Sequence, residues 1–227
     1  MIKNSIVPIG YVKSDFKEKF GIPRQSGRAN NLRAEIIFEK PFRNLDAFRG
    51  IEGFSHLWLL FDFSKAHFES NKLLVRPPRL GGNKKVGVFA SRSPFRPNNI
   101  GLSSVEFIEL KQTDDLGPVL VVAGADLLDG TPIYDIKPYL PFTDSHPNAK
   151  CGYAENSVDY KLKVEIPKEI CEFFSSDKLC ALEQCLADDP RPSYQEDGKI
   201  YGMSFAGVNI KFTVCNQLLT VISAEKE

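Results

Sequence analysis

The sequence predicts a mainly β protein with a small α/β part at its C-terminal end. Six short apolar or alternating runs follow one another in the first two thirds of the 227 residues, with no helical periodicity between them. The one convincing amphipathic helix comes after residue 156. Short strands separated by Gly, Pro and Asn clusters favour a barrel or a sandwich over βαβ units.

The expected strands of the first part are apolar or alternate between apolar and polar residues, as strands with a buried face do. They cover residues 7–12, 33–38, 54–63, 86–89, 102–110 and 119–123. One short helix is expected at residues 44–48, after Pro41.

The second part begins where the sequence changes character, near Asn156. Residues 157–166 alternate as a half-buried strand does. Ser176 is expected to cap a helix at residues 177–187, because a serine hydroxyl can accept a hydrogen bond from a free backbone N–H of the first turn. The apolar stripe of this helix consists of Leu179, Leu182 and Leu186. Two further strands are expected at residues 207–214 and 218–222.

Charge divides the chain at the same place, although 29 basic and 29 acidic residues give a net charge of zero. Residues 156–227 carry 8 basic and 12 acidic side chains, so residues 1–155 carry 21 and 17. We take 1–155 as a β domain and 156–227 as a small α/β domain. Two windows, residues 70–105 and 19–34, hold seven and four cations and no acid. They suit a polyphosphate partner, or they are solvated loops balanced by acids elsewhere.

The composition also excludes several classes of protein. No apolar run approaches the roughly 18 residues of a membrane span. Residues 1–5 lack the apolar stretch and the small-residue cleavage site of a signal peptide, so we expect none. Five cysteines without a C-x-x-C pair indicate reduced thiols in a cytoplasm, with Cys180 and Cys185 buried in the core. Neither they nor the three histidines have metal-ligand spacing, so we expect no metal. The G-x-G-x-x-G, Walker A, H-E-x-x-H and G-x-S-x-G motifs are absent.

Two loops carry candidate site residues. In residues 89–103, Arg92 and Arg96 lie among prolines and suit recognition of a carboxylate or phosphate, unless they pair with acids at the edge of the core. In residues 126–139, Asp135, Lys137 and Tyr139 occupy alternate positions and would point one way if the segment is extended. A bare turn at Asp-Gly-Thr-Pro is the alternative reading of this loop.

Motifs along nearly the whole chain resemble the signature of the TsaA-like (TrmO) family. They read P-R-Q-S-G at 23–27, F-S-H-L-W at 54–58, V-F-A-S-R-S-P-F-R-P-N at 88–98, I-G-L-S at 100–103, L-D-G-T-P at 128–132 and D-I-K-P-Y at 135–139. D-P-R-P-S-Y at 189–194 and Y-G-M-S-F at 201–205 continue the likeness. Asn99 stands where we expect proline in many relatives.

The resemblance implies a tRNA methyltransferase that uses S-adenosylmethionine to methylate N6 of N6-threonylcarbamoyladenosine, next to the anticodon. It also implies a β-barrel in place of a Rossmann-like fold, and a homodimer with the cofactor near the subunit interface. The residues that it carries over as cofactor contacts are Pro23, Arg24, Gln25, His56, Arg92, Leu102, Asp129, Gly130, Thr131 and Pro132, with Phe63 and Ser64 as weaker candidates.

The remaining roles are inferred from residue chemistry. Asp135 and Tyr139 are candidates for the general base or for orienting the substrate, and Lys137 for stabilising charge on the carbonyl. A flipped base could stack on Phe95 or Tyr139. The cations assigned to the tRNA backbone are Arg76, Arg79, Lys84, Lys85 and Arg96. The rival hypotheses are a non-catalytic RNA-binding barrel and a methyltransferase with another acceptor.

Overall fold

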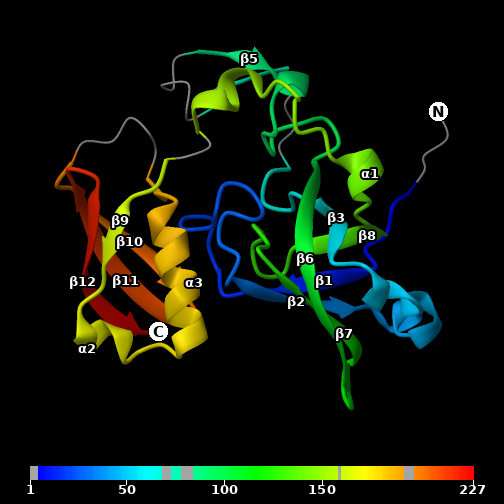
Figure 1. The fold of residues 1–227 in the computed structure, drawn as a ribbon. Coiled ribbons are helices and arrows are strands. Elements are labelled where there is room, and N and C mark those ends of the chain that lie inside the picture. The colour runs from blue at the N-terminus through cyan, green and yellow to red at the C-terminus, as the bar shows by residue number, and fades with distance from the viewer. Residues whose placement is uncertain (1–4, 68–72, 78–83, 158–159, 192–196) are drawn as a thin grey trace.

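The structure is a computed structural model that describes residues 5–67, 73–77, 84–157, 160–191 and 197–227, and it confirms the mainly β class. Six strands are hydrogen-bonded in the order β1-β2-β7-β6-β3-β8, and β1 pairs in turn with β8, so the sheet closes on itself (Figure 1). Its strands are β1 (Gly10–Lys13), β2 (Arg33–Phe38), β3 (His56–Asp62), β6 (Ile100–Thr113), β7 (Gly117–Ala123) and β8 (Pro132–Pro138).

Burial alternates along β3, because one face of this strand lies inside the closed sheet. On β3, Leu57, Leu59 and Phe61 are buried, while the residues between them are more exposed. Phe61 faces Gly101 across the strand pair, and a Cβ at position 101 would lie 2.3 Å from the Phe61 ring. A glycine is therefore required for this aromatic ring to fill the interior.

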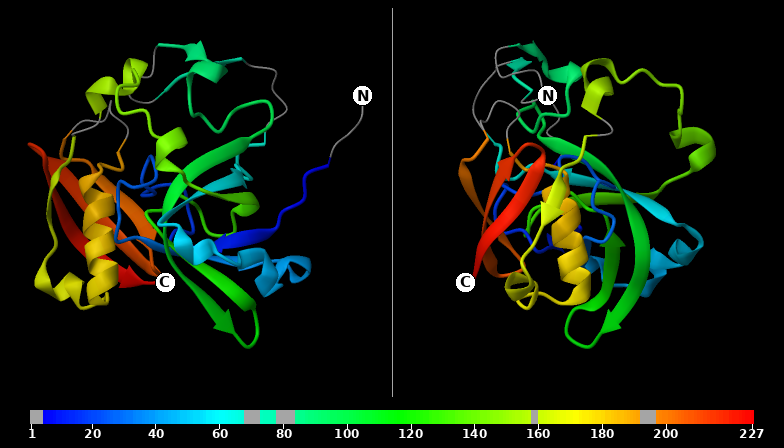
Figure 2. Two further views of the ribbon diagram at one scale, coloured as in Figure 1. Left: turned by 45° about the vertical axis from the view of Figure 1, so that its right-hand side comes forward. Right: turned by 60° about the vertical axis from the view of Figure 1, so that its left-hand side comes forward.

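A second core lies in the C-terminal part, where the strand order is β10-β11-β12-β9. Figure 2 shows α3 lying across one face of this sheet. Phe16, Ala29 and Leu32 from the N-terminal part join the same core, and the ring centroids of Phe16 and Phe205 are 5.3 Å apart. The elements are β9 (Lys163–Glu165), α2 (Lys168–Cys171), α3 (Ser176–Ala187), β10 (Ile200–Phe205), β11 (Val208–Cys215) and β12 (Leu218–Lys226).

The remaining elements are short. Strands β4 (Leu74–Val75) and β5 (Val86–Gly87) form a separate pair, and helix α1 (Pro141–Asp144) follows β8. The single-turn 3-10 helices are η1 (Lys40–Phe42), η2 (Leu45–Phe48), η3 (Ile51–Gly53), η5 (Val88–Ala90) and η6 (Gly152–Ser157). The short helix expected at residues 44–48 is thus a 3-10 turn, η2, in which the Asn44 side chain accepts a hydrogen bond from Asp46 N.

Several expected elements differ from those observed. The strand expected at 157–166 is reduced to β9, because Leu162 N donates to Ala187 O at the end of α3 and Arg28 donates to Tyr160 O; residues 158–159 lie outside the described part. The strand expected at 86–89 ends at Gly87, where η5 begins. Strands β8 and β10 were not expected. Helix α3 starts at Ser176, and its N-cap is Ser175, which makes no side-chain capping bond.

The expected burial of cysteines is right for Cys185 and wrong for Cys180. Helix α3 buries Ala181, Leu182, Cys185 and Leu186, so Cys180 lies outside this stripe and is exposed. No helix in the described segments is long and apolar enough to span a bilayer.

Alkylation of the native protein by iodoacetamide at pH 8 is expected to label Cys180 much faster than Cys185. Burial raises the pKa of the Cys185 thiol to about 12, and only the thiolate reacts. Peptide mass spectrometry measures the label at each site, with protein in denaturant as the control in which both react. Rapid labelling of Cys185 in the native protein would contradict this packing of α3.

Candidate functional site

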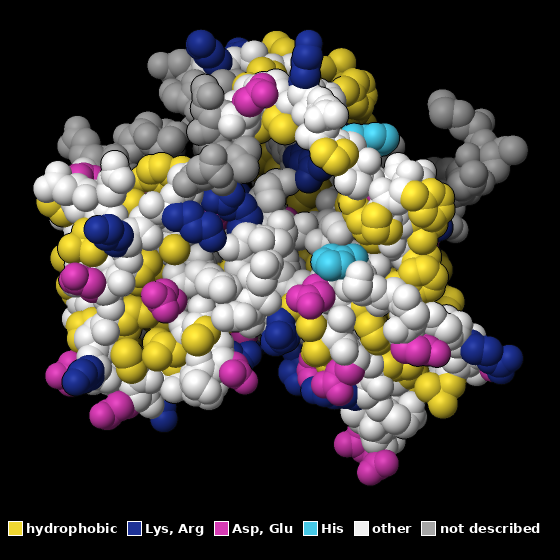
Figure 3. Space-filling model, viewed as in Figure 1, with side chains coloured by type: hydrophobic (Ala, Val, Ile, Leu, Met, Phe, Trp, Pro, Cys, Tyr) yellow, Lys and Arg dark blue, Asp and Glu magenta, His cyan; other side chains and the backbone are white. Residues whose placement is uncertain are grey.

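The motif loops meet at a cavity of about 2260 Å³ beside the closed sheet. Its described wall comes from residues 19–28, 61–66, 73–77, 89–99, 126–131 and 150–154 and from Pro190. In Figure 3, Lys and Arg side chains flank the hollow in the upper middle of the molecule. The described cations of the wall are Lys19, Arg24, Arg28, Lys65, Arg76, Arg92, Arg96 and Lys150, against two acids, Asp62 and Asp126.

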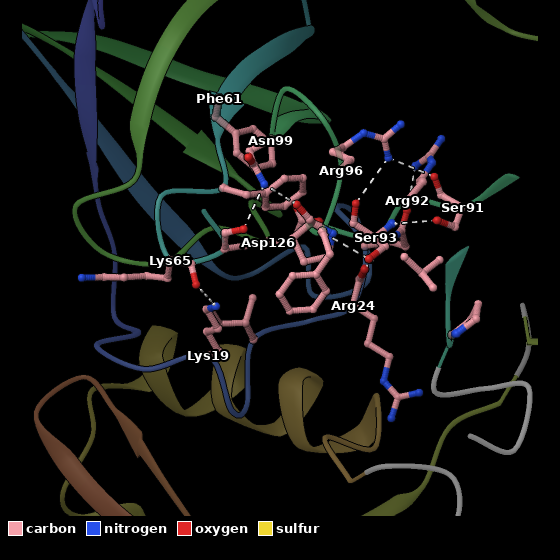
Figure 4. A pocket seen from close by; sticks show the side chains of 18 of the residues that line it. Lys19, Arg24, Phe61, Lys65, Ser91, Arg92, Ser93, Arg96, Asn99 and Asp126 are labelled. Atoms are coloured by element: carbon pink, nitrogen blue, oxygen red, sulfur yellow. Dashed lines mark hydrogen bonds between the residues drawn. The ribbon is translucent and has the colours of Figure 1, made fainter. Parts of the chain in front are cut away.

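Hydrogen bonds inside residues 89–99 fix the arginine-bearing loop. Arg96 Nη1 donates to Ser91 O at 3.0 Å and to Ser93 O at 3.3 Å, so this guanidinium braces its own loop (Figure 4). Asn99 has a φ of 48°, and its Nδ2 donates to Pro94 O at 2.8 Å and to Ala66 O at 3.0 Å. Proline holds φ near −65° and could not adopt this backbone. Asn99 therefore allows the turn that its side chain also stabilises by hydrogen bonds.

Ion pairs fix the P-R-Q-S-G loop to the C-terminal part. Arg28 Nε pairs with Asp188, which is only 2% exposed. Arg24 Nη2 donates to the carbonyl of Asp189 at 3.1 Å and to that of Arg191. Arg191 in turn pairs with Asp189 at 2.9 Å. The D-P-R-P motif therefore holds one wall of the cavity, where Pro190 is exposed to it.

Arg92 contacts the P-R-Q-S-G loop directly, because its Nη1 donates to Gln25 Oε1 at 2.7 Å. The bond links two motif loops that are 67 residues apart in sequence. Asp126 is in the same wall (Figure 4), and its Oδ1 accepts a hydrogen bond of 2.6 Å from the buried hydroxyl of Ser103. Burial raises the pKa of Asp126, opposed by this bond and by the positive charge of Arg92.

The structure places the predicted cofactor residues in two regions. Those in the cavity wall are Pro23, Arg24, Gln25, Phe63, Ser64, Arg92 and Thr131. Those outside the described wall are His56, Leu102, Asp129, Gly130 and Pro132. Asp129 accepts from Ser14 N at 3.0 Å and forms an ion pair with Lys17 at 2.6 Å. Its carboxylate thus fastens the segment that follows β1.

The predicted catalytic residues lie together on the outer face of the closed sheet. Asp135 and Lys137 of β8 lie opposite Leu60 and Trp58 of β3, and their side chains form an ion pair of 2.8 Å. The Tyr139 ring lies 5.5 Å from Trp58 and 6.2 Å from His56, measured between centroids. We expected Asp135, Lys137 and Tyr139 to point in one direction. The ion pair agrees with this expectation for Asp135 and Lys137. The structure brings them to His56 and does not bring them to Arg92.

Of the residues predicted to bind RNA, Arg76, Phe95 and Arg96 lie in the cavity wall. Lys84 and Lys85 are exposed outside it, and Arg79 lies outside the described residues.

Sequence reasoning missed several wall residues, among them Asp126, Asp62 and Phe89. Asp126 has a signal that could have been used, since it follows a buried strand and shares a loop with L-D-G-T-P.

Asp62 is buried at the end of β3, where His67 Nε2 lies 2.7 Å from its Oδ1. Burial, and then the negative charge of Asp62, raises the pKa of Tyr134. Phe89 is 81% exposed.

The cavity combines positive charge with exposed aromatic rings, since Phe89, Phe95 and Tyr153 lie beside its cations. This combination suits a ligand that carries both phosphates and aromatic bases. Among the described residues, no three His, Cys, Asp or Glu side chains gather as metal ligands. The fold and site thus define a mainly β protein with a nucleotide- or nucleic-acid-type cavity.

The chain belongs to the TrmO family. The family model "tRNA-methyltransferase O N-terminal domain" matches residues 11–145, and "TrmO C-terminal domain" matches residues 159–227. A relative in Escherichia coli K12, named tRNA (adenine(37)-N6)-methyltransferase, is 40% identical over 96% of each chain. Another, in Pseudomonas aeruginosa, is 42% identical over 88% of each and is named for S-adenosylmethionine-dependent methyl transfer. A crystal structure of TrmO from P. aeruginosa superposes with a TM-score of 0.81 at 34% identity, covering 100% of this chain and 99% of that one.

Replacing Arg28 by alanine is expected to destabilise the protein by about 3–5 kcal/mol, because it leaves the buried Asp188 carboxylate without its ion-pair partner. Urea unfolding followed by circular dichroism measures the change. Arg49→Ala is the matched control, since its pair with Asp46 has side chains 82% and 69% exposed and such pairs contribute about 0–1 kcal/mol. Equal effects in the two variants would show that the Arg28 pair does not join the two parts.

Proposed function

We propose that this chain is an S-adenosylmethionine-dependent tRNA methyltransferase that methylates N6 of adenine 37, with N6-threonylcarbamoyladenosine as the acceptor. The supporting observation is that the P-R-Q-S-G, R-S-P-F-R-P-N and L-D-G-T-P loops converge on one cationic cavity. The 40% identity to a protein named for adenine-37 N6-methylation gives the reaction. The threonylcarbamoyl group rests on the resemblance of the motifs.

The donors around the cavity fit this cofactor. Arg92 and Gln25 offer a guanidinium and an amide already held by their mutual hydrogen bond, and Phe63 offers an aromatic ring. A carboxylate, a ribose and an adenine need groups of these kinds. When bound, S-adenosylmethionine supplies a methyl group activated by a positively charged sulfur. The contribution of the chain is to hold the acceptor nitrogen in line with that methyl group and to take up the proton.

Asp135 is our candidate for the proton acceptor. Its carboxylate is held by Ile136 N at 3.0 Å and by the Lys137 ammonium. Lys137 would also stabilise negative charge on the carbonyl of the acceptor, and Tyr139 would orient its base. This assignment requires the outer face of β8 to meet a cofactor bound in the cavity.

A homodimer meets this requirement, and we include it in the proposal. The outer face of β6, β3 and β8 carries His56, Leu102 and Asp135. Leu102 is 52% exposed there. If this face packs against the cavity of a second copy, His56 and Leu102 come together with the predicted cofactor residues of the cavity wall and with the candidate base. We further propose that the closed sheet is the catalytic barrel of the family, within residues 1–155, and that residues 156–227 support the cavity wall.

The tRNA backbone is assigned to Arg76, Lys84, Lys85 and Arg96, with Phe95 available for a stacked base. Arg79, assigned to the same surface, lies outside the described residues. All five cysteines are free thiols, which fits a reducing cytoplasm as the place of action.

Bulk tRNA from a strain lacking this gene is expected to lose the N6-methylated form of N6-threonylcarbamoyladenosine and to keep the unmethylated form. Mass spectrometry of the nucleosides measures both, and the gene restored on a plasmid is the control. An unchanged nucleoside profile would refute the reaction. If the purified protein then bound tRNA in a salt-sensitive way and showed no affinity for S-adenosylmethionine in calorimetry, it would be a non-catalytic RNA-binding protein.

Two substitutions separate the proposed base from the proposed cofactor site. Asp135→Asn is expected to slow methyl transfer by about 100-fold or more, the usual contribution of a general base, with little change in affinity for S-adenosylmethionine. Arg92→Ala is expected to weaken cofactor affinity because it removes the guanidinium from the cavity. Single-turnover rates and calorimetry measure the two effects. A large loss of affinity with a normal rate in Asp135→Asn would move Asp135 to the cofactor site.

A further inference from the structure

Asp126 differs from the other acidic side chains near the cavity in having no cationic side chain within ion-pair distance among the described residues. Nearby, Asp129 pairs with Lys17, Asp188 with Arg28, and Asp189 with Arg191. The other acid of the wall, Asp62, faces the His67 ring.

A neutral donor holds the Asp126 carboxylate in place. Ser103 Oγ donates to its Oδ1 at 2.6 Å, and the nearby backbone of Ser26 helps to lower its pKa. The chain is closely packed at this point, because Gly27 N donates to Gly124 O at 2.9 Å and a Cβ at position 124 would lie 3.2 Å from Gly27 N. The carboxylate therefore lies where β6, the P-R-Q-S-G loop and the loop after β7 meet, and it is partly buried there.

Arg92 complements Asp126 from the loop that follows η5. Its positive charge acts on the Asp126 carboxylate, although the two side chains form no direct ion pair. Both belong to the wall of the same cavity (Figure 4). Because the Arg92 guanidinium uses one nitrogen for Gln25, its remaining N–H groups can serve a ligand.

We propose that Arg92 and Asp126 together form the receptor for the α-amino-acid end of the cofactor. In this arrangement the guanidinium of Arg92 binds the ligand carboxylate, and the carboxylate of Asp126 binds the ligand ammonium. A fixed cation and a fixed anion that do not neutralise one another are what a zwitterion requires. The inference rests on the proposed function only in that the ligand is S-adenosylmethionine.

The desolvation of Asp126 supports this role. A buried carboxylate gains more from an incoming ammonium than an exposed one, because water screens the interaction less. Burial raises the pKa of Asp126, which reflects this unfavourable environment for a charge without a cation. A bound ammonium would supply that cation. Asp129, which the resemblance gives as a cofactor contact, is already paired with Lys17.

The experiment compares two ligands that differ only at the amino-acid end. S-adenosylhomocysteine has this end, and 5′-methylthioadenosine lacks it, while both carry the adenosine. Calorimetry of Arg92→Ala and Asp126→Asn is expected to show affinity for S-adenosylhomocysteine falling by about 10- to 100-fold, the range for losing one charged hydrogen bond. Affinity for 5′-methylthioadenosine is expected to stay within about twofold of wild type. Asp46→Asn, which removes an exposed carboxylate far from the cavity wall, is the matched control and leaves both affinities unchanged.

Equal losses for both ligands would overturn the inference, because a merely structural role would weaken the whole pocket. Unchanged affinity for S-adenosylhomocysteine in Asp126→Asn would also overturn it. If that variant does not fold, the wild-type protein decides: analogues of S-adenosylhomocysteine without the amino group and without the carboxylate must each bind at least tenfold more weakly. The experiment uses no tRNA, so an error in the proposed acceptor does not affect its result. A wild-type protein that binds neither nucleoside would overturn both the proposed cofactor and this inference.

Discussion

The buried ion pair between Arg28 and Asp188 is the contact on which the cavity depends. It joins the segment between β1 and β2 to the turn that ends α3, and so it connects the closed sheet to the C-terminal core. Phe16 and Leu32, at either side of that loop, are buried in the same core. The P-R-Q-S-G loop is therefore held from the C-terminal part through Arg24 as well as from the end of β7 through Gly27, which explains why Pro190 forms part of the cavity wall.

Charge distribution follows from this arrangement. A chain with a net charge of zero can still build a strongly positive cavity when its cations lie in acid-free windows and its acids are used elsewhere. Asp188 and Asp189 are neutralised by Arg28 and Arg191 at the junction, and Asp129 by Lys17. The cations that remain along the wall face only Asp62 and Asp126 among its described residues. The acids of the C-terminal part thus fix the loop without cancelling the charge of the cavity.

Local patterns predicted β2, β3, β6 and β7, because alternation and apolar runs directly express a buried face. They did not predict β8, whose bounding prolines and polar residues indicate a turn; its hydrogen bonds to β1 and β3 come from segments far away in the chain. The same limit applies to the site. Residue types identified Arg92 and Asp135 as candidates, and the family resemblance added Gln25, yet only the closure of the sheet shows that Asp135 faces outward. The sequence places Asp126 after a buried strand and beside L-D-G-T-P, but its lack of an ion-pair partner within the described part of the chain depends on how distant segments meet.

Strand β3 makes the need for a second copy concrete. His56 lies at one end of its seven residues, and Phe63 and Ser64 follow the other end. At a rise of 3.3 Å per residue, His56 and Ser64 are roughly 20–25 Å apart. One bound cofactor cannot contact both residues of the same protomer. If all the predicted cofactor residues are right, two protomers must share each site, with His56, Asp135 and Tyr139 from the outer face of one closing the cavity of the other. If the protein is a monomer, His56 and Leu102 are not cofactor contacts, and the proton acceptor must be sought among the groups that line the cavity itself.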